Sequence, residues 1–175
     1  MTAALIAIGS NLGDRVAHLR HARAGLEALP ATVLRGLSRI YETAPVGGPD
    51  NQGPYLNAAA LVETELAPRA LLDALHAIEA ERERERVVRW GARTLDLDLL
   101  THGAAVSDDP TLTLPHPRLH ERRFVLVPIC DVAPEAVHPQ LGETMAALLA
   151  ALPVEPGDLT ATETAWTASA LTETE

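Results

Sequence analysis

The stretch from Arg89 to Leu100, RWGARTLDLDLL, is the most informative part of this chain. From Thr94 onward, polar residues and leucines alternate with the period of two that a half-buried strand requires. Side chains at i and i+2 share one face of a strand, so Asp96 and Asp98 should point the same way, about 7 Å apart. The other face, which we expect to enter the core, carries Leu95, Leu97 and Leu99.

Two neighbouring carboxylates favour a bound cation. They repel each other unless a positive charge lies between them, and hard cations such as Mg²⁺ prefer oxygen ligands. Arg89 and Arg93 lie just upstream, where they could contact an anion that such a metal carries. The segment therefore predicts a metal–phosphate site on a strand, although a solvent-facing edge strand without a ligand has the same alternation.

Length and composition indicate a single globular domain. The 175 residues are 47% hydrophobic and 22% charged, and no apolar run approaches the roughly 20 residues needed to span a bilayer. The net charge of −10 argues against nonspecific nucleic-acid binding. The N-terminal residues indicate a buried strand rather than a signal peptide. A single cysteine, Cys130, lies in an apolar run and suits a reducing compartment, so we expect a cytoplasmic protein with no membrane contact.

The chain contains no lysine, since all 14 of its basic residues are arginine. A Walker A P-loop, a protein-kinase lysine and a Schiff-base lysine each need an amine, so these chemistries are excluded. If the protein handles phosphates, arginine side chains, backbone N–H groups and metal must bind them.

Periodicity and turn residues predict an α+β fold. The Gly-rich strand–turn–helix of a dinucleotide-binding unit is missing, which favours a largely antiparallel sheet with helices on its faces. A Gly- and Pro-rich loop over 42–54 separates two strands and is longer than a hairpin requires. From Pro153 onward Thr, Ala, Glu and Pro dominate, so we expect disorder. The expected strands cover 3–8, 33–41, 55–66, 96–98, 112–114 and 124–127, and the expected helices cover 16–29, 145–151 and a segment beginning at Pro68.

Six segments taken together resemble one family, the 6-hydroxymethyl-7,8-dihydropterin pyrophosphokinases of folate biosynthesis. The segments are AIGSNLGDR, YETAPVG, YLNAA, RWGARTLDLDLL, LPHPR and ERRFVLVP, and they follow the family's order between about Ala3 and Pro134. RTLDLDLL followed by LPHPR and ERRF is a very specific combination. The resemblance implies a ferredoxin-like α+β fold for a domain over residues 1–152 and leaves the tail, 153–175, outside it.

The same resemblance implies an ATP-dependent diphosphokinase. Such enzymes move an intact pyrophosphoryl group from ATP, the co-substrate, to the hydroxymethyl oxygen of the pterin and release AMP. Asp96 and Asp98 match the family carboxylates that hold two Mg²⁺ ions. This agrees with the interpretation from the residues, because catalysis of such transfers depends mainly on positioning and electrostatic stabilisation.

A set of ATP contacts is also implied by the resemblance. Arg84 and Arg86 match arginines on a mobile family loop, although Glu83 stands where the family usually has Gly and Ala92 where it commonly has Pro. We expect Arg82 and the glutamates around it to be solvated. The implied ATP-binding residues are Glu79, Arg84, Arg86, Trp90, Arg93, His116 and Arg122, and the implied catalytic residues are Arg84, Arg93, Asp96 and Asp98.

Pterin recognition falls, by the same resemblance, to five residues. A flat, polar heteroaromatic ring can lie between two aromatic planes, and an amide supplies both a donor and an acceptor to its edge. For the aromatic residues, ordinary core packing is the alternative. The implied pterin-binding residues are Thr43, Val46, Tyr55, Asn57 and Phe124.

Two other functions are compatible with parts of the sequence. An inert module derived from such an enzyme would bind ATP or pterin without turnover, but it would have no need of Asp96, Asp98 and His116. A metal-dependent glycosyltransferase-like enzyme also uses Asp-x-Asp pairs, but the short chain lacks a nucleotide-binding βαβ unit. We therefore expect a monomeric pyrophosphokinase whose partners are small-molecule substrates, ATP and a reduced pterin.

Overall fold

The computed structural model describes residues 1–44, 53–83 and 94–167 of the chain. Its strands are β1 (Thr2–Ser10), β2 (Thr32–Leu37), β3 (Tyr41–Thr43), β4 (Tyr55–Thr64), β5 (Asp96–His102), β6 (Ser107–Asp109), β7 (Leu112–Leu114) and β8 (Leu159–Ala161). Its helices are α1 (Arg15–Glu27), α2 (Pro68–Glu83), α3 (Arg123–Val132), α4 (Met145–Ala150) and a short 3₁₀ helix, η1 (Leu119–Glu121).

The main sheet is antiparallel throughout, with the strand order β5-β1-β4-β3-β8. β2 also pairs with β4, on the edge that β1 does not use. The units β1-α1-β2 and β4-α2-β5 are therefore two split βαβ units, each with a strand of the other unit inserted between its own strands. This arrangement is ferredoxin-like, and it confirms the predicted α+β fold with a largely antiparallel sheet.

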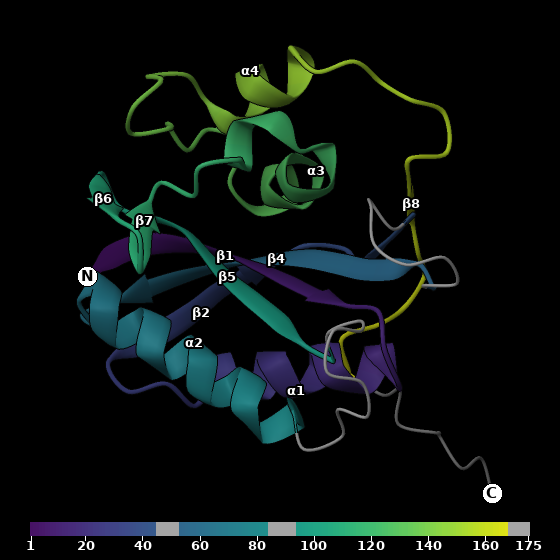
Figure 1. Cartoon of the computed structure of the whole chain (residues 1–175), viewed down its shortest axis with the longest axis horizontal. Coiled ribbons are helices and arrows are strands. Elements are labelled where there is room, and N and C mark those ends of the chain that lie inside the picture. Colours follow the sequence, from purple (N-terminus) through teal and green to yellow (C-terminus); the bar gives the residue numbers. More distant parts are fainter. Residues whose placement is uncertain (45–52, 84–93, 168–175) are drawn as a thin grey trace, which may run out of the picture.

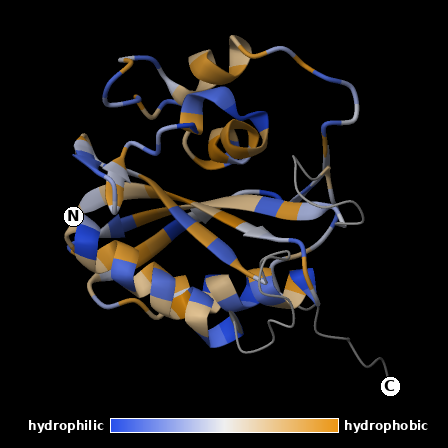
Figure 2. Ribbon diagram, viewed as in Figure 1, coloured by the Kyte–Doolittle hydropathy of each residue, from blue (hydrophilic) through white to orange (hydrophobic). Residues whose placement is uncertain are grey.

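Helices cover both faces of the sheet, with α1 and α2 on one face and α3 and α4 on the other (Figure 1). The alternation along β1 divides the core between the two faces. Ala4, Ile6 and Ile8 pack in the cluster shared with α1 and α2, whereas Leu5 and Ala7 pack toward α3 and α4. Figure 2 shows hydrophobic residues along the strands between these layers, and alternating hydrophilic and hydrophobic residues on α1 and α2.

β5 has the alternation that the sequence predicts. Leu95, Leu97 and Leu99 are buried in the core that α1 and α2 cover. Asp96 and Asp98 lie on the other face of the strand, where both line a cavity. The local sequence therefore places two carboxylates side by side on the face that α3 covers.

The predicted strand over 124–127 is wrong, because these residues belong to α3. A short apolar run rich in valine has a similar composition in a strand and in a buried helix, so its periodicity alone does not decide. Packing against β4 and α4 selects the helix here. The buried residues of the helix follow helical spacing: Val125, Leu126, Pro128 and Ile129.

The expected disorder from Pro153 onward is wrong for the residues up to Trp166. β8 pairs antiparallel with β3, and Trp166 packs against the core that α1 and α2 cover. A three-residue strand and one tryptophan leave almost no trace in a composition dominated by Thr, Ala and Glu. Residues 168–175 lie outside the described part of the chain.

Two smaller points complete the fold. The single strand predicted over 33–41 is divided into β2 and β3. Within the described ranges, no helix combines the length and the apolar character needed to cross a membrane.

Candidate active site

A cavity of about 750 Å³ lies between the sheet and the beginning of α3. This volume falls within the roughly 300–1,000 Å³ that is typical of small-molecule sites. β1, β3, β4 and β5 contribute its floor, and η1, α3 and the C-terminal segment contribute its walls. The lining includes eight of the predicted site residues: Thr43, Tyr55, Asn57, Asp96, Asp98, His116, Arg122 and Phe124.

The strand register sets the floor of the cavity. Gly9 of β1 pairs with Asp96 of β5 on one side and with Asn57 of β4 on the other. Neighbouring strands lie about 4.8 Å apart, so the backbones of these two residues are separated by about 10 Å. Because glycine has no side chain, the floor between the carboxylate and the amide is open. A Cβ at this position would lie 3.2 Å from Asn57 Oδ1.

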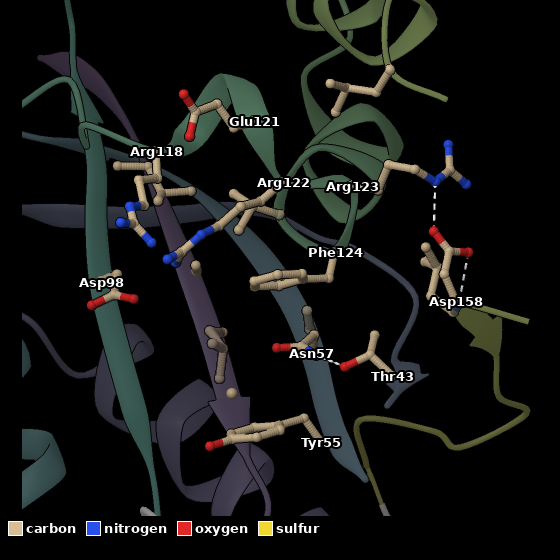
Figure 3. Close-up of a pocket in the computed structure, with 18 of the residues that line it drawn as sticks. Thr43, Tyr55, Asn57, Asp98, Arg118, Glu121, Arg122, Arg123, Phe124 and Asp158 are labelled. Atoms are coloured by element: carbon tan, nitrogen blue, oxygen red, sulfur yellow. Dashed lines mark hydrogen bonds and ion pairs between the residues drawn. The ribbon is translucent and has the colours of Figure 1, made fainter. Parts of the chain in front are cut away.

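The end of the cavity at β5 is charged, and we call it the carboxylate half: Asp96, Asp98, His116, Arg118 and Arg122. Figure 3 shows the guanidinium groups of Arg118 and Arg122 pointing toward Asp98. Across residues 1–44, 53–83 and 94–167, no group of three His, Cys, Asp or Glu side chains could hold a metal ion alone. A pair of carboxylates still fits Mg²⁺, which keeps several waters and shares its ligands with substrate phosphates.

Glu79 lies behind the carboxylate half and does not line the cavity. Its Oε2 accepts a hydrogen bond of 3.1 Å from the backbone N–H of Leu97, the residue between the two aspartates. Burial raises the pKa of Glu79 to about 7, and the carboxyl of Asp96 contributes to the rise, although the hydrogen bond from Leu97 opposes it. Glu79 therefore ties α2 to the strand that carries the aspartates.

His116 is fixed on both sides. Its backbone N–H donates to Leu100 O at 2.8 Å, and its Nδ1 accepts a hydrogen bond of 3.3 Å from the Arg118 backbone N–H. Burial lowers the pKa of His116, and the charges of Arg122 and Arg118 lower it further. The imidazole is therefore neutral near pH 7 and carries its proton on Nε2, which makes it a donor for an anionic ligand.

The opposite end of the cavity contains four uncharged side chains, which we call the amide half: Thr43, Tyr55, Asn57 and Phe124. Asn57 Nδ2 donates to Thr43 Oγ1 at 2.6 Å, which fixes the orientation of the amide. In Figure 3 the rings of Phe124 and Tyr55 lie on either side of Asn57. The Arg122 guanidinium carbon lies 5.5 Å from the centroid of the Phe124 ring, so a cation–π contact joins the two halves.

Some of the predicted residues cannot be placed. Val46, Arg84, Arg86, Trp90 and Arg93 lie outside the described residues, so their roles stay predictions. Arg82 is placed, and the expectation that it is solvated is wrong. Its Nη2 donates to Ala17 O at 3.2 Å and links α2 to α1.

The cavity also contains residues that sequence reasoning missed. Arg118, Glu121 and Arg123 line it, and all three stand in the LPHPR and ERRF segments that carried the resemblance. Their closeness in sequence to His116 and Arg122 could have predicted that they line the site. The C-terminal segment between Leu152 and Leu159 also contributes lining, and no motif there pointed to it.

Comparison with known proteins identifies one family. The family model described as 7,8-dihydro-6-hydroxymethylpterin-pyrophosphokinase matches residues 5–134. A 2-amino-4-hydroxy-6-hydroxymethyldihydropteridine pyrophosphokinase of Haemophilus influenzae is 45% identical over 139 residues, which cover 79% of this chain and 86% of the relative. The protein of the same name from Pseudomonas aeruginosa is 44% identical over 150 residues, which cover 86% and 91%.

Solved structures support the fold. A Plasmodium falciparum HPPK-DHPS triple mutant superposes with a TM-score of 0.66 over 85% of this chain. The sequences are 12% identical, so this similarity concerns the fold alone. The chain spans 43% of that protein, less than half its length.

Proposed function

The chain belongs to the 7,8-dihydro-6-hydroxymethylpterin-pyrophosphokinase family, and from that premise we propose how its residues divide the work of the reaction. It is an ATP-dependent pyrophosphokinase of folate biosynthesis. The hydroxymethyl oxygen of 6-hydroxymethyl-7,8-dihydropterin attacks the β-phosphorus of ATP. The bond between the β-phosphorus and the oxygen that bridges it to the α-phosphorus breaks. AMP leaves with that oxygen, and the hydroxyl proton is released.

The row Asp96–Gly9–Asn57 is the observation that carries the assignment of roles. It spans three adjacent strands and places a carboxylate and an amide at the two ends of an open floor. A pterin held at the amide would direct its hydroxymethyl group toward the carboxylates. We therefore assign the pterin to the amide half and the ATP phosphates to the carboxylate half.

The carboxylate half would hold the metal. Asp96 and Asp98 are the proposed ligands of two Mg²⁺ ions, with phosphate oxygens and water completing the coordination. When bound, Mg²⁺ would neutralise negative charge on the phosphate oxygens as the transfer proceeds. Glu79, rather than contacting ATP directly, would hold the aspartate-bearing strand in place through the N–H of Leu97.

Three cationic or hydrogen-bonding side chains would position the phosphates. Arg122 and Arg118 can pair with phosphate oxygens in the geometry that guanidinium groups favour. His116 would donate from Nε2. Arg84 and Arg93 as catalytic residues, and Arg86 and Trp90 as further ATP contacts, stay part of the proposal on the strength of the resemblance.

The amide half would select the pterin. Asn57 presents Oδ1 and one N–H to the polar edge of the ring, because its other N–H is directed to Thr43. Phe124 and Tyr55 would bind the two faces of the ring. Val46 completes the proposed pterin site.

Product analysis tests the chemistry directly. The enzyme is incubated with ATP, Mg²⁺ and 6-hydroxymethyl-7,8-dihydropterin, and AMP and ADP are separated by chromatography. We expect AMP in step with the pterin pyrophosphate. ADP would mean attack on the γ-phosphorus and would contradict the proposal, and tight binding of both ligands without turnover would favour an inert module.

We also propose that the protein acts as a monomer in the cytoplasm. Within the described residues, a single chain brings eight of the predicted site residues to one cavity of small-molecule size, which is the support for a monomer. The single cysteine is half-buried and suits a reducing compartment. Light scattering coupled to size-exclusion chromatography should give the mass of one chain, 18.6 kDa.

A further inference from the structure

The C-terminal segment from Leu152 to Trp166 forms a strap across the edge of the sheet. In Figure 1 its yellow trace runs from α4 through β8 toward α1. Its first part lines the cavity through residues that include Glu155, Asp158 and Leu159. We propose that this strap is a wall of the pterin site and that Asp158 is a positioning residue for pterin binding.

The far end of the strap is firmly anchored. Trp166 Nε1 donates to Ser38 O at 2.8 Å, and the indole packs against the core that α1 and α2 cover. Both the backbone N–H and the Oγ1 of Thr162 donate to Ile40 O at 2.9 Å. These contacts hold the segment that follows β8 against the rest of the domain.

β8 connects the strap to the amide half. Leu159 pairs with Thr43, the residue whose Oγ1 accepts the hydrogen bond from Asn57. β3 has only three residues, and β8 lies on the edge that β4 leaves open. The strap therefore holds β3 from its outer side and keeps Thr43 in register with the amide.

Asp158 connects the strap to α3. Its Oδ2 accepts a hydrogen bond of 2.7 Å from Arg123 Nε, and both side chains are mostly buried, with 27% and 20% of their surfaces exposed. Its Oδ1 accepts from the Leu159 backbone N–H at 2.8 Å, so the carboxylate is held at both oxygens. Arg123 is the first residue of α3 and directly precedes Phe124.

This ion pair separates the roles of neighbouring arginines. Figure 3 shows Arg118 and Arg122 pointing toward Asp98, whereas Arg123 points the other way, to Asp158. Asp158 thus directs Arg123 away from the phosphates and fixes the end of α3 from which Phe124 projects. Loss of the pair should loosen Phe124 and Thr43 together, and these residues contact the pterin rather than ATP.

The inference rests on the proposed assignment of the amide half to the pterin, and its test is a comparison of Michaelis constants. For Asp158→Asn we expect the KM for the pterin to rise about tenfold, as for loss of a partly buried charged hydrogen bond. The kcat and the KM for ATP should change less than about twofold, because the carboxylate half is untouched. Asp158→Glu should recover most of the pterin affinity.

A control and a second variant separate this role from general stability. Glu63→Gln removes the exposed ion pair with Arg35 on β2 and β4, and it should leave both constants unchanged. Thr162→Val loosens the strap outside the cavity and should weaken pterin binding in the same direction, by less. Melting temperatures and circular dichroism establish whether each variant is folded. If Asp158→Asn does not fold, the pterin KM of Thr162→Val decides the test.

The opposing outcomes distinguish the two proposals. If Asn57→Ala weakens pterin binding in calorimetry and neither Asp158→Asn nor Thr162→Val does, the role of the strap is wrong and the site assignment stands. If Asn57→Ala also has no effect, the assignment of the amide half is wrong. A rise in both Michaelis constants by the same factor would reduce Asp158 to a structural residue and overturn the inference.

Discussion

The two halves of the cavity lie on one face of one sheet but differ in chemistry. The carboxylate half, at β5, concentrates Asp96, Asp98, Arg118 and Arg122, whereas the amide half, at β3 and β4, has no charged member. Gly9 separates them, with one neighbour from each half. In the proposed assignment, a charged phosphate chain and a flat polar ring would meet over Gly9, where the floor has no side chain, and such an arrangement favours a transfer between them.

The halves also differ in how the chain builds them. The two aspartates are brought together by the period of two along a single strand. The amide half requires β3, β4, α3 and the C-terminal strap, which are far apart in the sequence. We therefore expect substitutions in the carboxylate half to lower kcat and substitutions in the amide half to raise the KM for the pterin.

The largest effect should come from the carboxylates. Asp98→Ala or Asp96→Ala should lower kcat by at least about 10³-fold, because the Mg²⁺ ions that would neutralise the phosphate charge lose a carboxylate ligand. Steady-state rates at saturating Mg²⁺ are the measurement. Asp108→Ala removes an exposed acid on β6 and is the matched control. Near-normal turnover in either site variant would show that the metal assignment is wrong.

The amide half should respond in KM instead. Asn57→Ala should raise the KM for the pterin by about 10–100-fold, since a polar ring edge loses its partner at a cost of about 1–3 kcal/mol. The KM for ATP should stay nearly constant. Gln140→Ala removes an exposed amide and serves as the control. A comparable rise in both Michaelis constants would erase the distinction between the halves.

A smaller effect is expected at the boundary. Gly9→Ala places a methyl group 3.2 Å from Asn57 Oδ1, which must shift by a few tenths of an ångström. We expect kcat/KM for the pterin to fall by about 3–10-fold, as for modest overpacking. Gly36→Ala, where the methyl group would lie 3.4 Å from Val132, is the control. An unchanged kcat/KM would mean that the pterin does not lie over this part of the floor.

Glu79 should have the smallest effect on turnover and a clear effect on the pH dependence of stability. Its pKa is raised from 4.5 to about 7, so the folded state favours the protonated carboxyl. Its stabilising contribution is present below about pH 4.5 and is lost as the pH rises to about 7.

Glu79→Gln keeps an acceptor for Leu97 and removes the titration. In protein freed of divalent ions by chelation, denaturant unfolding at pH 8 should show the variant to be more stable, by about 1–3 kcal/mol. The difference should vanish at pH 4.5. A pH-independent difference between the two proteins would contradict the assigned pKa. Asp73→Asn, at an exposed acid on the same helix, is the control.

Several features followed from the sequence because their causes are local. The alternation of Leu95, Leu97 and Leu99 with two aspartates specified both the strand and the faces to which its side chains point. The helix that begins at Pro68 follows from the proline and the apolar spacing after it. The resemblance of the six segments indicated further site residues, and eight of the predicted residues line one cavity.

Other features depend on contacts that no local pattern records. The residues 124–127 are apolar enough for either a strand or a helix, and packing against β4 and α4 selects the helix. Arg82 has the sequence context of a solvated charge, yet the nearby Ala17 carbonyl binds it. The strap has the composition of a disordered tail, and the open edge of β3 together with Arg123 orders it.

The sequence by itself determined the fold class and the carboxylate pair, because both depend on periodicity within short segments, and the resemblance of its six segments indicated the family of the reaction. Only the tertiary structure decided which strand lies between Asp96 and Asn57 and what closes the far end of the cavity. Register and docking depend on summed contacts between distant segments, and those contacts exist only once the sheet has formed.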